Sequence, residues 1–138
     1  MANKPIRIIL VDDHKLTRKS WKAILEYDSR FTIINECDNR IDAINQAGEL
    51  MPDVIMIDLN MHPVNGFDIT QNILKTNPSI KIIGISVNNQ PFYAKRMQEI
   101  GGSGFITKGS PFDEVMNAIE EVLNGEFFIC NETKKLIS

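Results

Sequence analysis

Three aspartates of this 138-residue sequence stand where short apolar runs end. Asp12 and Asp13 follow the run IRIILV, and Asp58 closes the run DVIMID. Two unit charges about 4 Å apart repel by roughly 4 kcal/mol at an effective dielectric of 20, so carboxylates that meet need either a raised pKa or a cation. Oxygen ligands favour a hard ion, and the lack of nearby cysteines or of a histidine pair argues against zinc. The three acids therefore predict a Mg²⁺ site.

A hydroxyl and an ammonium group end two further apolar runs. Ser86 closes the run IKIIGIS, and Lys108 directly follows GFIT. A carboxylate beside Mg²⁺ and a lysine is placed to attack phosphorus and form an aspartyl phosphate. Taken singly, each residue has an ordinary explanation: the aspartates cap turns, the serine lies in a turn and the lysine is solvated. Their joint placement, in complementary types, is the more specific signal.

Five apolar runs predict the strands that must bring these residues together. They cover residues 6–11, 31–37, 53–58, 80–86 and 104–107. Each run is rich in β-branched residues and bounded by polar, glycine or proline positions. The first, third and fourth runs are apolar almost throughout, which is typical of parallel strands covered on both faces. Since ligands bind beyond the carboxyl ends of such strands, we expect the candidate site residues to converge at one edge of the sheet.

Amphipathic segments between the runs predict five helices, so strand and helix alternate as in an open α/β sheet with right-handed crossovers. We expect the fifth helix to open with Ser110 as its cap and Pro111 in its first turn, and to end at Gly125. The core-facing positions are predicted to be Leu16, Ser20, Ala23, Ile24 and Tyr27 in the first helix, Ile41, Ile44, Gly48 and Met51 in the second, Ile69 and Ile73 in the third, Tyr93, Met97 and Ile100 in the fourth, and Phe112, Val115, Ile119 and Val122 in the fifth.

Composition indicates one globular domain. The net charge of −3 provides no basic field for nucleic acid. No apolar run approaches the roughly 20 residues of a membrane span, and the first residues lack a signal-peptide pattern, so we expect a cytoplasmic protein without membrane contact. Cys37 and Cys130 match no metal or redox spacing and are expected to be reduced thiols. Residues 1–125 are expected to form the domain; residues 126–138 form a C-terminal tail, a strand-like extension or the start of a linker.

The site residues give the chain a resemblance to the receiver domain of two-component response regulators, over about residues 5–125. The residues that carry it are the acidic pair of VDDH, the aspartate of MIDLNM, the hydroxyl of GISVN and the lysine of GFITK, in that order. Gly66 also matches the family's loop. The tail GEFFICNETKKLIS resembles the segment after the receiver in the NarL class of transcription regulators. The resemblance implies a five-stranded parallel sheet in a flavodoxin-like (βα)₅ three-layer sandwich.

The resemblance also implies a role for each acid. Asp58 accepts a phosphoryl group from the phosphohistidine of a sensor histidine kinase. Asp13 ligates Mg²⁺ directly, whereas Asp12 acts mainly through a bound water. Asp58 and the backbone carbonyl of Asn60 complete the protein ligands. Mg²⁺ is the one cofactor implied, and the protein is a phosphoacceptor that takes part in its own phosphorylation and dephosphorylation rather than an enzyme.

The remaining implied roles concern phosphate recognition and the switch. Ser86 donates a hydrogen bond to one phosphoryl oxygen, and Lys108 pairs with another. Phe105 occupies the aromatic switch position, where the ring follows Ser86 as that residue moves toward the phosphate.

Some positions depart from the family pattern. The sequence Met61-His62-Pro63 places proline one residue later than usual, which leaves the loop conformation open. Val87 stands where a small residue is preferred and is expected to restrict access to the phosphoryl site. Asn60 and Asn88 stand at positions that tune phosphoryl lifetime, in a direction that the sequence does not set.

Four further residues near the site receive ordinary explanations. His14 and His62 are expected to be solvated loop histidines, although histidine titrates near neutrality. Arg18 and Trp21 are expected to have packed or surface roles rather than to recognise a kinase.

Two other functions remain open. One is a Mg²⁺-dependent phosphohydrolase of the dehalogenase type, but its nucleophile would lie in a D-x-D pair, whereas Asp12 and Asp13 are adjacent. The other is an interaction domain that keeps the receiver shape without being phosphorylated, but such proteins usually lose an acid or the lysine. We favour a receiver that belongs to a longer regulator over a free-standing one. It would control transcription, form homodimers, and contact nucleic acid only through an output domain outside this chain.

Overall fold

A single parallel sheet organises the protein. The computed structural model describes residues 4–137. The strands are β1 (Ile6–Val11), β2 (Phe31–Cys37), β3 (Val54–Asp58), β4 (Lys81–Ser86), β5 (Gly104–Thr107) and β6 (Phe128–Ile129). They lie in the order β2-β1-β3-β4-β5-β6, and every neighbouring pair is parallel. The five predicted strands and the predicted α/β class are therefore confirmed.

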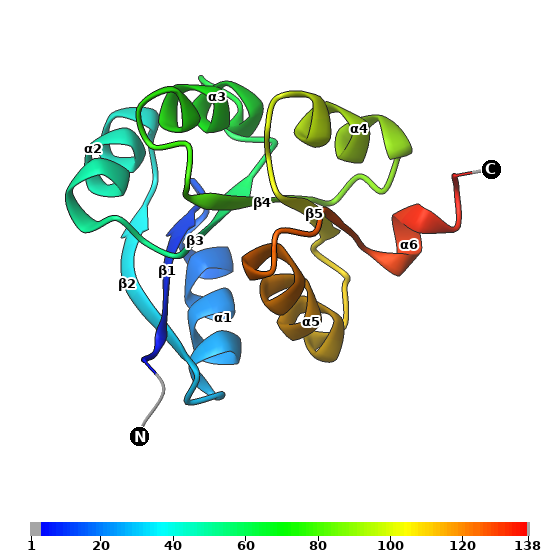
Figure 1. The fold of residues 1–138 in the computed structure, drawn as a ribbon, viewed down its shortest axis with the longest axis horizontal. Coiled ribbons are helices and arrows are strands. Elements are labelled where there is room, and N and C mark those ends of the chain that lie inside the picture. The colour runs from blue at the N-terminus through cyan, green and yellow to red at the C-terminus, as the bar shows by residue number, and fades with distance from the viewer. Residues whose placement is uncertain (1–3, 138) are drawn as a thin grey trace.

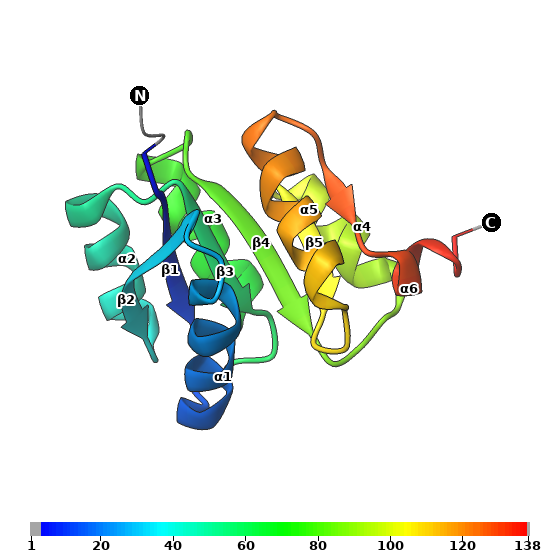
Figure 2. The same ribbon diagram turned by 90° about the horizontal axis from the view of Figure 1, so that it is seen from below.

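Helices cover both faces of the sheet, which gives three layers. The helices are α1 (Lys15–Glu26), α2 (Arg40–Leu50), α3 (Gly66–Thr76), α4 (Pro91–Glu99), α5 (Phe112–Leu123) and α6 (Asn131–Lys134). In Figure 1, α2, α3 and α4 lie on one side of the sheet, and α1 and α5 lie on the other. Figure 2 shows α1 and α5 side by side across the strands. No helix in the described part of the chain has the length and apolar character needed to cross a membrane.

The sheet core explains why the chain folds this way. All five residues of β3 are buried, as are the last four of β1 and the last five of β4. Strands buried on both faces read as continuous apolar runs, which is the pattern that predicted them. Burial contributes about 25 cal/mol per Å² of apolar surface, so this central layer helps to hold the carboxyl ends of the strands together.

The predicted core faces are confirmed for α3, α4 and α5, wrong for α1, and right in part for α2, where Ile44 packs against the core. In α1 the buried residues are Trp21 and Leu25, whereas Leu16 and Tyr27 are exposed. This helix carries apolar residues on two faces; Trp21 and Leu25 lie four residues apart, and the face that they share turns inward. In α2 the buried residues are Ala43 and Ala47, and Ile41 and Met51 are exposed. Met51 is the left-handed cap that ends α2, so helical spacing does not apply to it.

The expectation of five strands is also wrong by one, because the tail adds β6. Phe128 and Ile129 pair with Gly104 and Phe105 of β5, and α6 follows at once. A strand of two residues is too short for a periodicity signal.

The start of α5 differs by one residue from the prediction. Pro111 is the N-cap, and helical geometry begins at Phe112. The Ser110 hydroxyl instead accepts a hydrogen bond of 3.1 Å from the backbone N–H of Thr107. It therefore braces the turn after β5 and does not cap the helix.

Candidate functional site

The carboxyl ends of β1 and β3 bring the three predicted aspartates together. Asp12, Asp13, His14 and Asp58 each offer one side-chain atom that could bind a metal, and these four atoms all lie within 4.8 Å of one another. Asp58 is the last residue of β3, and Asp12 follows the last residue of β1, which is the adjacent strand. The parallel register is thus what converts a large sequence separation into contact.

Asp12 is 5% exposed and is held on both of its carboxylate oxygens. Oδ1 accepts a hydrogen bond of 2.8 Å from the backbone N–H of His14. Oδ2 lies 3.8 Å from Nζ of Lys108. The guanidinium of Arg18 donates to the backbone carbonyl of Asp12 at 2.6 Å, which fixes the turn between β1 and α1.

Asp58 is 2% exposed, and its carboxylate has two nearby donors. Oδ1 accepts a hydrogen bond of 2.9 Å from the backbone N–H of Asn60, and Oδ2 lies 3.7 Å from Nζ of Lys108. Burial, and then the neighbouring Asp12 and Asp13 charges, raise the pKa of Asp58, although the Asn60 N–H and Lys108 act in the opposite direction. The three carboxylates therefore bring more negative charge to this sheet edge than the Lys108 ammonium neutralises.

Asp13 provides the observation that points to a cation. Its Oδ1 is buried and has no hydrogen-bond partner within residues 4–137. Nδ1 of His14 lies 3.0 Å from this oxygen, but without hydrogen-bond geometry. Oδ2 accepts a long hydrogen bond of 3.4 Å from the backbone N–H of His62. A buried carboxylate oxygen without a donor costs free energy, and an oxygen-binding cation such as Mg²⁺ would remove that cost. These residues thus fit a hard cation.

Ser86 and Lys108 approach the same edge from β4 and β5. Ser86 is fully buried; its Oγ donates to Oδ1 of Asn60 at 2.6 Å and accepts from the backbone N–H of Asn88 at 3.0 Å. The backbone N–H of Lys108 donates to the carbonyl of Ser86 at 2.9 Å, which ties the two strand ends together. The Lys108 ammonium reaches two acids and remains partly exposed, so it is available to an incoming anion.

Phe105 lies inside the protein, on β5. It is fully buried, and its ring stacks on Tyr93 of α4 with a centroid separation of 6.2 Å and an interplanar angle of 19°. Tyr93 stacks in turn on Phe67 of α3 at 5.9 Å. A row of aromatic rings thus joins β5 to two helices on one face of the sheet.

Three residues in the loops after Asp58 and Ser86, which the sequence resemblance singled out, can now be placed. Val87, expected to restrict access to the phosphoryl site, is 73% exposed. A Cβ on Gly66 would meet the backbone oxygen of Asp58 and would lie 2.8 Å from Cα of Leu59. The family glycine therefore permits the start of α3 to approach the chain next to Asp58. The peptide bond between His62 and Pro63 is cis.

Sequence reasoning missed several contacts at the site. The His14 side chain is 65% exposed, as expected for a solvated histidine, but its Nδ1 also lies 3.2 Å from Asp12 and 3.0 Å from Asp13. Arg18 donates a hydrogen bond to the backbone carbonyl of Asp12, and Trp21 is packed, as expected. The amide side chain of Asn60 contacts Ser86, a contact that the resemblance did not imply. Adjacency to Asp13 was the available signal for His14; no sequence signal pointed to the other contacts.

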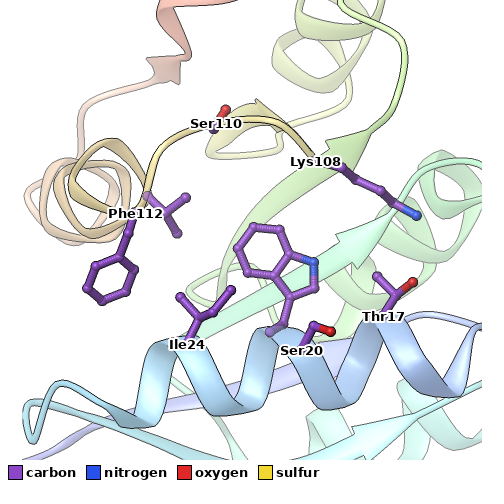
Figure 3. A pocket seen from close by; sticks show the side chains of 8 residues that line it. Thr17, Ser20, Ile24, Lys108, Ser110 and Phe112 are labelled. Atoms are coloured by element: carbon purple, nitrogen blue, oxygen red, sulfur yellow. The ribbon is translucent and has the colours of Figure 1, made fainter.

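A hollow between α1 and α5 opens beside the site. It has a volume of about 220 Å³ and is lined by Thr17, Ser20, Trp21, Ile24, Lys108, Ser110, Phe112 and Val115. In Figure 3 the Lys108 side chain extends toward the Thr17 end of the hollow, and Phe112 lies at the opposite end beside Ile24. Lys108 is therefore shared between the acidic cluster and this hollow.

Comparison with known proteins decides the family. The profile of the response regulator receiver domain matches residues 8–120. The chain belongs to the response regulator receiver domain family. This receiver domain is 32% identical over 128 residues to the response regulator UvrY of Escherichia coli K12, covering 92% of this chain and 58% of that protein. It is 30% identical over 124 residues to the response regulator GacA of Pseudomonas aeruginosa, covering 90% of this chain and 58% of GacA.

Solved structures agree with this assignment. A two-component response regulator of the LuxR family from Aurantimonas sp. SI85-9A1 matches with a TM-score of 0.90 and 26% identity, covering 96% of this receiver domain and 94% of that chain. The isolated receiver domain of RcsB from Salmonella enterica serovar Typhimurium matches with a TM-score of 0.85 and 21% identity, covering 98% of this chain and all of that one, which shows the shared fold. The predicted family and its NarL/LuxR class are confirmed, and the dehalogenase-type alternative loses its basis.

Proposed function

We propose that this receiver domain is a Mg²⁺-dependent phosphoacceptor that takes a phosphoryl group on Asp58 from a sensor histidine kinase. The observation that carries the proposal is the meeting of Asp12, Asp13 and Asp58 with Lys108 at one sheet edge, where one Asp13 oxygen is buried without a hydrogen bond. Family membership supports the same function. The chain spans 58% of the length of its curated relatives UvrY and GacA, so control of transcription through a further domain is part of the proposal.

The chemistry follows from the groups that surround Asp58. A carboxylate oxygen of Asp58 attacks phosphorus, the bond from phosphorus to the histidine nitrogen breaks, and the nitrogen keeps that electron pair. Mg²⁺, held by Asp13, Asp58 and the carbonyl of Asn60, with Asp12 acting through a water, would offset the charge on the phosphoryl oxygens. Lys108 pairs with one of these oxygens, and Ser86 donates to another after it leaves the Asn60 side chain.

Phosphorylation then acts on a two-state equilibrium. Converting a mostly inactive population to a mostly active one requires a differential stabilisation of about 5 kcal/mol. Several charge-assisted hydrogen bonds from Ser86, Lys108 and backbone N–H groups can supply this free energy. We propose that Ser86 and Phe105 form the switch, because Phe105 joins β5 to the aromatic row that reaches α4 and α3. The proposed outputs are a changed self-association and a changed output domain.

The direct test is phosphorylation by a small donor. Incubation with Mg²⁺ and acetyl phosphate should add one phosphoryl mass to the intact chain. Asp58→Ala should abolish this gain, whereas the matched variant Asp113→Ala, at an exposed site on α5, should retain it. Undiminished labelling of Asp58→Ala would overturn the assignment, and the absence of labelling in the unmodified chain would favour an interaction domain that is not phosphorylated.

A further inference from the structure

Glu132 of α6 joins two loops that carry phosphoryl-site residues. Its Oε1 accepts a hydrogen bond of 2.8 Å from the Thr107 hydroxyl, and its Oε2 accepts one of 2.8 Å from the Asn89 side-chain amide. Thr107 directly precedes Lys108, and Asn89 lies three residues after Ser86. One carboxylate from the C-terminal segment thus connects the loop after β4 with the end of β5.

The C-terminal segment, residues 126–137, packs against the rest of the domain close to the proposed switch residue Phe105. Ile129 pairs with Phe105, and the backbone N–H of Cys130 donates to the carbonyl of Phe105 at 3.0 Å. Cys130 and Thr133 are fully buried. The backbone N–H of Asn131 donates to Glu114 of α5 at 2.7 Å. In Figure 1, α6 lies at the edge of the sheet next to β5 and α4.

The loop after β4 is coupled to Ser86 through its hydroxyl. The Ser86 Oγ donates to Asn60 and accepts from the backbone N–H of Asn88. A phosphoryl oxygen can become the new acceptor only when this hydroxyl leaves Asn60. Because the Asn88 N–H is bound to the same oxygen, movement of the hydroxyl pulls on the loop, and Asn89 is the next residue in that loop. The Asn89–Glu132 hydrogen bond therefore opposes the movement.

We propose that Glu132 is a positioning residue that couples the phosphoryl site to the C-terminal segment. In the unphosphorylated protein its carboxylate holds the loop after β4 and the end of β5 in place. Phosphorylation of Asp58 draws Ser86 and its loop away, breaks the Asn89 contact and loosens α6. This inference rests on the proposed function. By thermodynamic linkage the coupling is reciprocal, so removal of the Glu132 contact favours phosphorylation.

Cys130 offers a readout that is distant from the phosphoryl chemistry. Its thiol is fully buried under α6, and we expect alkylation by N-ethylmaleimide to increase at least about fivefold when Mg²⁺ and beryllofluoride hold the protein in its phosphorylated-like state. Cys37 serves as an internal reference for general unfolding, because burial raises the pKa of its thiol to about 11. Its alkylation should stay unchanged. Peptide mass spectrometry separates the two sites.

Substitutions distinguish coupling between the phosphoryl site and the C-terminal segment from a purely structural role of Glu132. Glu132→Ala and Asn89→Ala should each raise Cys130 alkylation without beryllofluoride and also speed Asp58 labelling by acetyl phosphate severalfold. The double variant should gain no more than Glu132→Ala alone, because that substitution already removes the contact with Asn89. Glu132→Gln should behave like the unmodified chain. Its side-chain amide can accept a hydrogen bond from the Thr107 hydroxyl and donate one to the side-chain oxygen of Asn89. Glu126→Ala, at an exposed acid of the same segment, is the matched control.

Three results would overturn the coupling. One is a phosphorylated chain whose Cys130 alkylation is unchanged. A second is a Glu132→Ala chain whose labelling rate equals that of Glu126→Ala, even if α6 is looser, because that pattern indicates a structural role alone. A third, total absence of phosphoryl mass, would remove the proposed function and the coupling together, so the two failures are distinguishable.

Discussion

At the scale of single residues, the site concentrates charge at some cost to stability. Asp58 is 2% exposed, and burial, followed by the Asp12 charge, raises its pKa. A carboxyl group whose pKa is higher in the folded state than in the unfolded state stabilises the fold fully below its unfolded pKa. That contribution is lost as the pH rises through the folded pKa. At neutral pH, without a cation, ionised Asp58 should therefore destabilise the fold.

Asp58→Asn should therefore be more stable than the unmodified chain. Without Mg²⁺ at pH 7, we expect its free energy of unfolding in urea to be higher by about 1–2 kcal/mol. The difference should shrink as the pH falls through the raised pKa and vanish below about 4, where the unfolded carboxyl is also protonated. Asp113→Asn, on the exposed surface of α5, is the matched control and should show no comparable gain at pH 7. A less stable Asp58→Asn at pH 7 would contradict the sign of this shift.

Removal of the Lys108 charge should strengthen Mg²⁺ binding and weaken phosphorylation. Its Nζ lies 3.7 Å from Asp58 and 3.8 Å from Asp12, so its charge competes with a divalent cation. We expect Lys108→Met to bind Mg²⁺ more tightly, on the order of tenfold by isothermal titration calorimetry. Labelling by acetyl phosphate should fall, because the phosphoryl oxygen loses its partner. Lys95→Met, on the exposed face of α4, should change neither quantity. Weaker Mg²⁺ binding by Lys108→Met would show that the lysine does not oppose the cation.

At the scale of elements, the strands were predictable and two helix faces were not. The buried strands β1, β3 and β4 have almost continuous apolar sequences, so their carboxyl ends, and with them Asp58 and Ser86, could be placed from the sequence. The α1 face was misplaced because two sets of residues share helical spacing, and only packing selects Trp21 and Leu25. Nothing local distinguishes such sets, because tertiary contacts decide which face is buried.

Gly66 allows α3 to start close to Asp58. Alanine at this glycine should destabilise the fold by a steric clash, whereas alanine at an unhindered helical glycine should stabilise it through helix propensity. Gly66→Ala should lower the free energy of unfolding by about 1–3 kcal/mol, because the new Cβ meets the Asp58 backbone oxygen. Gly48→Ala, inside α2 with its nearest neighbour 3.9 Å away, should instead raise it by about 0.5–1 kcal/mol. Urea denaturation of both variants measures the change in the free energy of unfolding, which should be negative for Gly66→Ala and positive for Gly48→Ala. A stable Gly66→Ala would mean that this approach is looser than the structure indicates.

At the scale of the whole molecule, the tail was expected to be a strand-like extension or the start of a linker, and its place beside β5 could not be predicted. The strand β6 has two residues and α6 has four, so neither produces a periodic pattern. The contacts of Glu132 with Thr107 and Asn89 depend on how these elements pack and have no sequence motif. The acids, by contrast, were predictable as a set because the parallel topology fixes where strand ends meet.

Cation binding should stabilise the molecule as a unit. At a Mg²⁺ concentration 100 times the dissociation constant, the free energy of unfolding should rise by about 2.7 kcal/mol, and chelation should reverse the gain. Asp13→Ala should lose most of this stabilisation, because it removes the buried oxygen without a hydrogen bond. Thermal denaturation with and without Mg²⁺ measures the effect. An equal gain in Asp13→Ala would place the cation elsewhere.

A crystal structure of this chain with Mg²⁺ and beryllofluoride would test directly whether the acids gather at one edge to share a hard cation and present Asp58 to phosphorus. We predict beryllium bonded to Asp58, Mg²⁺ bound by Asp13, Asp58 and the carbonyl of Asn60, and Ser86 and Lys108 each contacting a fluorine. A structure in which Mg²⁺ avoids Asp13, or in which Lys108 points away from the Asp58 adduct, would contradict the account.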